Sequence, residues 1–94
     1  MKLVVRDRAV ADLEHIHAWI ARDSPRSADA VIDRIRMRIS MLLTPGSARM
    51  GRPGLVSGTR ELIQPPYVIV YRVDEANEQI DVMAVFHGRQ DRSR

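Results

Sequence analysis

The stretch Tyr67-Val68-Ile69-Val70-Tyr71-Arg72-Val73 decides the fold of this chain. Side chains of an extended strand alternate between two faces. One face would carry Tyr67, Ile69, Tyr71 and Val73, and the other would carry Val68 and Val70. Because both faces are apolar, we expect a central strand that is covered on each side. A helical layer can cover one side, and an intermolecular partner is the natural candidate for the other.

Two further apolar runs flank this strand, at residues 59–64 and 79–87. Pro65-Pro66 and the polar residues 75–78 separate the three runs, so we predict an antiparallel three-stranded meander. Before the meander, residues 44–57 contain three glycines and two prolines. We expect a long loop there, which carries Arg49 and Arg52.

The N-terminal half predicts one strand and two helices. Residues 2–6 form a short apolar run with two β-branched valines, which favours a strand. Apolar residues at helical spacing then predict a helix from Asp7 to just before Ser24. Ser24-Pro25 signals the start of a second helix, which keeps its apolar period to Leu43. The predicted α+β fold has the order strand, helix, helix, strand, strand, strand, with a helical hairpin packed on a small, mainly antiparallel sheet.

Length and composition fit one domain over residues 1–94. The chain has a formal net charge of +3, and 14 of its 15 basic residues are arginine. It has no cysteine, which excludes disulfides, a thiolate nucleophile and cysteine-based metal sites. No apolar run is long enough for a signal peptide or a membrane span, so we expect a cytoplasmic protein without a membrane partner. The small core leaves no room for an enclosed cofactor, and we predict none.

The histidines and strand arginines are the candidates for chemistry. His15 and His17 lie two positions apart on a predicted helix and therefore point in different directions, so we predict no metal site. A period of two places five residues of the last strand on one face: Gln79, Asp81, Met83, Val85 and His87. If that face meets those of the neighbouring strands, a cationic patch with one imidazole forms from Arg60, Arg72, His87 and Arg89.

Such a patch has two interpretations. An imidazole among arginines can act as an acid or base at a phosphodiester. The alternative is a solvated sheet face in which the arginines pair with Glu61, Asp74 and Asp81. On residue types alone we favour the ion-paired face.

Six fragments occur along the chain in this order: Ala9 to Ile16, Asp23-Ser24-Pro25, Pro45 with Gly51-Arg52, Gly58-Thr59-Arg60-Glu61-Leu62, Tyr67 to Val73, and Val85-Phe86-His87-Gly88-Arg89. Together they resemble the RelE/ParE superfamily of bacterial toxins over nearly the whole chain. The fourth fragment and the His-Gly-Arg ending look more like the ParE branch. The resemblance implies the toxin of a type II toxin–antitoxin system, in a hetero-oligomer with a cognate, ParD-like or related antitoxin.

The two branches imply different activities. ParE-type toxins are associated with inhibition of DNA gyrase, and RelE-type toxins cut mRNA in the ribosome. In the RNA-cleaving interpretation Arg60, Arg72 and His87 are the catalytic candidates. This sequence departs from that branch, because no lysine follows Lys2 and no tyrosine follows Tyr71. We therefore favour a non-enzymatic ParE-like toxin.

In the favoured interpretation the arginines and the histidine contact the target or the antitoxin: Arg49, Arg52, Arg60, Arg72, His87 and Arg89. Direct binding of nucleic acid stays open. A third hypothesis, an inert structural or adaptor module, predicts that expression leaves growth unchanged.

Overall fold

The computed structural model describes residues 1–89. Its elements follow the predicted order, and their bounds are β1 (Lys2–Val5), α1 (Asp7–Ala21), α2 (Pro25–Ser40), the 3-10 turn η1 (Met41–Leu43), β2 (Arg52–Pro53), β3 (Arg60–Gln64), β4 (Tyr67–Asp74) and β5 (Gln79–His87). The two-residue strand β2 lies inside the segment that was predicted to be loop. The predicted α+β architecture is therefore confirmed, with one short strand added.

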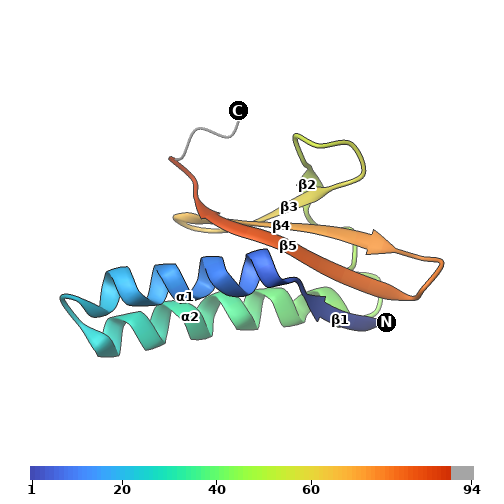
Figure 1. The fold of residues 1–94 in the computed structure, drawn as a ribbon. Helices are drawn as coiled ribbons and strands as arrows, with labels where there is room; N and C mark the ends of the chain where they lie inside the picture. Colours follow the sequence, from blue (N-terminus) through green and yellow to red (C-terminus); the bar gives the residue numbers. More distant parts are fainter. Residues whose placement is uncertain (90–94) are drawn as a thin grey trace.

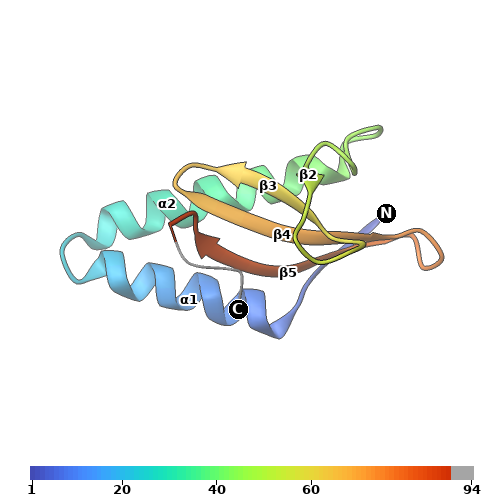
Figure 2. The same ribbon diagram turned by 90° about the horizontal axis from the view of Figure 1, so that it is seen from above.

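Helices α1 and α2 form the predicted hairpin below the sheet (Figures 1 and 2). Ser24 begins α2 as predicted, because its side-chain oxygen accepts a hydrogen bond from the Ser27 N–H at 3.1 Å and Pro25 occupies the first turn. The apolar stripe of α2 is buried at Ala28, Ile32, Ile35 and Ile39. The spacing of these residues turns one side of the helix to the core and leaves the charged side in solvent.

The sheet has the order β1-β5-β4-β3-β2. Strands β3, β4 and β5 pair antiparallel, which confirms the meander and the internal position of β4. Strand β1 pairs parallel with β5, from Lys2 opposite Gln79 to Val5 opposite Val82. Strand β2 pairs antiparallel with β3 through Arg52 and Pro53. The strands β1 and β2 therefore form the two edges of the sheet (Figure 1).

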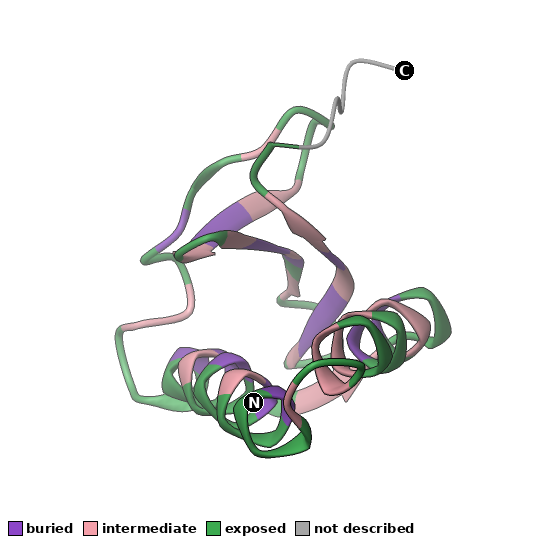
Figure 3. Ribbon diagram, turned by 90° about the vertical axis from the view of Figure 1, so that its left-hand side faces the viewer, coloured by how far each residue is buried: buried purple, intermediate pink, exposed green. Residues whose placement is uncertain are grey.

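The core lies between the hairpin and one face of the sheet, where the buried residues gather in Figure 3. Leu13 and Ile35 from the helices meet Ile69, Tyr71 and Val82 from the strands, among others. Within residues 1–89 no second layer of helices or strands covers the opposite face, which we call the outer face. Val68 on that face is nevertheless only 4% exposed. Within residues 1–89, every helix is too short or too polar to span a bilayer.

Helix α1 also supplies a hydrogen-bond acceptor at the edge of β5. Strand β1 ends opposite Val82, where the Arg6 N–H donates to the Val82 carbonyl at 2.9 Å. Farther along β5, the Val85 N–H donates instead to the Asp12 carboxylate of α1 at 2.9 Å. A side chain thus satisfies a backbone donor at a strand edge that β1 does not reach.

Candidate functional site

A β-bulge in β5 separates the residues that were predicted to share one face. Val70 of β4 lies opposite Ala84, but its neighbour Tyr71 lies opposite Val82, so Met83 is an extra residue. A bulge of this kind reverses the alternation of side chains beyond it. Val85 and His87 consequently share the helix-facing side with Tyr71, whereas Asp81 and Gln79 share the outer face with Arg72. The prediction that Gln79, Asp81, Met83, Val85 and His87 share one face was wrong.

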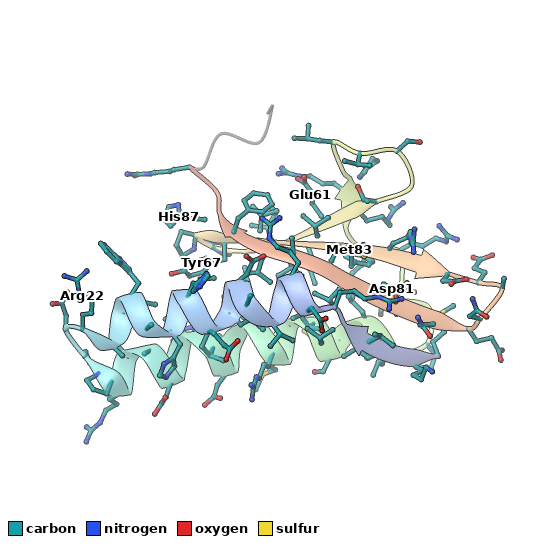
Figure 4. The ribbon with its side chains drawn as sticks, in the orientation of Figure 1. Arg22, Glu61, Tyr67, Asp81, Met83 and His87 are labelled. Carbon is teal, nitrogen blue, oxygen red and sulfur yellow. The ribbon has the colours of Figure 1, made fainter. Side chains whose placement is uncertain are left out.

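His87 lies at the end of β5, opposite Tyr67 of β4. The two rings meet edge to face, with centroids 5.7 Å apart and planes inclined by 79°. The His87 Nδ1 accepts a hydrogen bond from the backbone N–H of Arg89 at 3.1 Å. In Figure 4, His87 and Tyr67 lie near one end of the sheet and Asp81 lies toward the other. The imidazole is therefore held by its aromatic neighbour and by the chain turn that follows it.

Arg60 is engaged by the loop that precedes it. Its guanidinium donates from Nε to the Gly51 carbonyl at 3.1 Å and from Nη2 to the Arg49 carbonyl at 3.0 Å. Arg60 lies opposite Tyr71, and His87 lies opposite Tyr67. These two partners are four positions apart along β4, so Arg60 and His87 are separated by the same length of the sheet. Four strand residues span about 13 Å, so the backbone positions of Arg60 and His87 are about that far apart along the strands.

The outer face carries buried carboxylates that pair with arginine. Asp81 is fully buried, and its Oδ1 lies 2.7 Å from Arg6 Nη2 while its Oδ2 lies 3.6 Å from Arg72 Nη2. Glu61 is 5% exposed and accepts from Arg52 at 3.0 and 3.2 Å. Arg49 pairs with Glu75. Of the ion pairs expected for the patch arginines, the structure shows the one between Arg72 and Asp81. Glu61 pairs instead with Arg52 of β2, and both carboxylates are buried rather than solvated.

Asp74 is the last residue of β4, and its carboxylate accepts hydrogen bonds from the turn that joins β4 to β5. Its Oδ2 accepts from the Asn77 side-chain amide at 2.9 Å and its Oδ1 accepts from the Asn77 backbone N–H at 3.2 Å. These hydrogen bonds favour the charged form, with the side-chain bond the largest cause, and they lower the pKa of Asp74 from its ordinary value of 3.8.

The candidate catalytic residues Arg60, Arg72 and His87 therefore do not converge. Arg72 lies on the outer face beside Asp81, and Arg60 and His87 lie at separate positions on the helix-facing side. Arg89 follows His87 on the exposed chain. Of the six candidate contact residues, Arg49, Arg52 and Arg60 gather around Gly51. His87 and Arg89 are joined by a hydrogen bond at the end of β5, and Arg72 lies apart from both groups.

A groove of about 760 Å³ lies between the helical hairpin and β1. Six of its nine lining residues are apolar, and the complete lining is Leu3, Val5, Val10, Leu13, Glu14, His17, Ile32, Arg36 and Ile39. The three polar residues come from the helices, and His17 also contacts Asp29 at 2.7 Å. His15 is exposed while His17 is half-buried, so the two side chains have different surroundings. An apolar groove with a few polar groups suits an amphipathic peptide segment.

A family model and a relative that match this chain both describe a toxin. A family model described as the ParE toxin of the type II toxin–antitoxin system parDE matches residues 3–92. A protein of Sinorhizobium fredii (strain NBRC 101917 / NGR234), Y4kP, whose name marks it as a candidate toxin, is 36% identical over 86 residues, covering 88% of this chain and 83% of its own.

Two solved structures share the fold. The chromosomal ParDE toxin–antitoxin system of P. aeruginosa contains a chain that superimposes with a TM-score of 0.81 at 24% identity, covering 93% of this chain and 95% of that one. The RelBE2 toxin–antitoxin complex of Mycobacterium tuberculosis contains one that superimposes with a TM-score of 0.57 at 22% identity, covering 92% and 95%.

Proposed function

Because this chain belongs to the ParE toxin family of type II toxin–antitoxin systems, we propose that it inhibits DNA gyrase in the cytoplasm and that a cognate antitoxin neutralises it. The observation that carries this proposal is the family match over residues 3–92. Inhibition occurs by binding, without covalent chemistry on the part of the toxin. The proposed target is a protein, and the toxin and its antitoxin form a hetero-oligomer.

The positions of the charged side chains support binding rather than catalysis. A general acid or base must lie within hydrogen-bond reach of the group it serves, and charge-stabilising donors must point to the same atom. Arg60 donates to two backbone carbonyls, Arg72 lies beside Asp81 on the outer face, and His87 packs against Tyr67. The three residues share no common point around which a phosphodiester would be cleaved.

The groove between the hairpin and β1 is the proposed docking site of the antitoxin. Its apolar floor accepts the apolar side of an amphipathic segment, and Glu14 and Arg36 offer one charge of each sign to its polar side. Val10 lines the groove and is 42% exposed, so it can be changed without opening the core. Val10→Glu should weaken antitoxin binding about 30-fold or more, because the carboxylate would lie against apolar side chains. Met37→Glu, at an exposed position outside the lining, is the control.

Pulse labelling after induced expression without the antitoxin tests the target. We expect incorporation of labelled thymidine to fall before incorporation of labelled methionine, because inhibition of gyrase stops replication first. Purified toxin should also inhibit supercoiling by purified gyrase. An earlier loss of methionine incorporation would contradict the proposal and would favour a ribosome-dependent endoribonuclease. His87→Ala separates the two further: a gyrase inhibitor keeps most of its toxicity, and an RNase that uses His87 loses it.

A further inference from the structure

The turn that joins β2 to β3 presents two adjacent apolar side chains to solvent. Leu55 is 66% exposed and Val56 is 69% exposed. In Figure 1 this turn extends on the side of the sheet away from the helices. We call residues 54–59 the hairpin tip. Exposed apolar residues that occur singly need no explanation, whereas adjacent ones on a projecting turn form a continuous apolar surface that a partner can cover.

Hydrogen bonds within the hairpin tip fix its shape. The Gly54 N–H donates to the Thr59 carbonyl at 2.9 Å, and the Thr59 N–H and hydroxyl both donate to the Val56 carbonyl, at 3.0 and 2.6 Å. Gly54 packs so closely that a Cβ there would lie 2.3 Å from the Thr59 hydroxyl oxygen. Gly58 has a φ of 85°, a conformation that favours glycine. Leu55 and Val56 are therefore presented by an ordered turn.

The base of the hairpin tip is anchored to the core. The Gly51 N–H donates to the hydroxyl of Tyr71, a fully buried residue, at 3.0 Å. Arg60 holds the Gly51 and Arg49 carbonyls, and Arg52 pairs with the buried Glu61. A binding element that is already ordered loses less conformational entropy when it binds. The anchors thus give the apolar tip the preorganisation that a binding surface needs.

The charge around the tip indicates what it fits. Residues 49–60 contain three arginines and no acidic residue. Glu61 and Glu75 pair with Arg52 and Arg49, so the local charge is 3 − 2 = +1. The side chains of Arg49 and Arg52 remain more than half exposed. An apolar tip beside exposed guanidinium groups is complementary to an apolar pocket with carboxylates at its rim.

We propose that Leu55 and Val56 insert into an apolar, acid-rimmed pocket of the target protein, and that the hairpin tip is the target-binding surface of this toxin. This inference rests on the proposed function and adds the residues through which the target is held. The tip adjoins the β2 edge of the sheet, and the groove adjoins the β1 edge. Target binding and antitoxin binding therefore use separate side chains and can be lost independently.

The test compares two double variants, each of which removes two exposed apolar side chains. Leu55→Ser/Val56→Ser changes the tip, and Trp19→Ser/Met37→Ser changes two helix residues that are 69% and 68% exposed. Affinity is measured for purified gyrase and for the cognate antitoxin, together with growth arrest on expression. We expect the tip variant to lose about 30-fold or more in gyrase affinity and to stop arresting growth. Its antitoxin affinity, and both affinities of the helix variant, should stay within about threefold of wild type.

The outcomes separate this inference from the proposed target. If the tip variant arrests growth and binds gyrase like wild type, the hairpin tip is not the target-binding surface. If wild-type toxin does not bind gyrase but only the tip variant loses growth arrest, the proposed target is wrong and the surface is supported. If the tip variant loses antitoxin affinity as strongly as toxicity, the two surfaces are not separate. A wild-type chain that neither binds gyrase nor arrests growth overturns both proposals.

Discussion

The Tyr71 hydroxyl is a single group whose removal tests how the loop before β3 is anchored to the core. Tyr71 is fully buried and its hydroxyl accepts the N–H of Gly51, which is also buried, at 3.0 Å. In Tyr71→Phe the ring keeps its packing, so the change removes this acceptor and leaves a backbone donor without a partner. An orphaned buried donor costs about 1–3 kcal/mol of unfolding free energy.

The expected loss can be measured as a melting temperature. For a domain of this size, a loss of about 2 kcal/mol lowers the melting temperature by about 8–16 °C. Tyr67→Phe is the matched control, because it makes the same chemical change on the same strand at a half-buried position. We expect the control to stay within about 0.5 kcal/mol of wild type. Chemical denaturation of the three proteins gives the free energies directly.

Hydrogen exchange locates the effect. In Tyr71→Phe the Gly51 amide should exchange faster than in wild type by more than the loss of global stability explains, because its own acceptor is gone. If Tyr71→Phe matches Tyr67→Phe in stability and Gly51 stays protected, the hydroxyl does not anchor the loop. The base of the hairpin tip would then lack the anchor to Tyr71 on which its preorganisation depends.

Three further changes test local features. Asp12→Ala should cost about 1–2 kcal/mol by orphaning the Val85 N–H, and Asp12→Asn, which keeps an acceptor, should restore most of it; equal melting temperatures for the two variants would contradict this. Ser24→Ala should cost about 1 kcal/mol through loss of the α2 cap, while Ser27→Ala costs little by the same denaturation assay. In an NMR titration the pKa of the Asp74 carboxyl in the folded protein should lie below 3.8. Its contribution to stability is therefore present above pH 3.8 and is lost as the pH falls through the lowered pKa. A titration midpoint above 3.8 would exclude the hydrogen bonds from Asn77.

The sequence was sufficient for the order of the elements because its local signals agree with one another. Ser24-Pro25 gave the start of α2 almost to the residue, since capping needs only neighbours in the chain. The alternation from Tyr67 to Val73 gave the internal strand β4 for the same reason. Strand β2 was missed because two residues between glycines carry no periodicity, and their pairing depends on the distant strand β3.

The candidate site was harder to predict because it depends on register. Counting in twos along β5 assumes an unbroken ladder, and the extra residue Met83 reverses every face assignment on one side of it. Nothing in the local residue types marks Met83 as a bulge. The burial of Glu61 and Asp81 was also out of reach, since it depends on arginines from β2, β4 and the end of β1 that pair with them.

The parallel pairing of β1 with β5 has a consequence for synthesis. Its partners Lys2 and Gln79 are 79 − 2 = 77 positions apart, and pairing over such a distance in the chain is slow to form because closing the long loop costs entropy. During translation β1 has no partner until the ribosome has made and released residues 79–82. Leu3 and Val5, which form one wall of the groove, are therefore placed only then. Under the proposed docking in this groove, a nascent toxin that lacks β5 would offer the antitoxin an incomplete surface, and the antitoxin would bind the toxin only after β5 has been made.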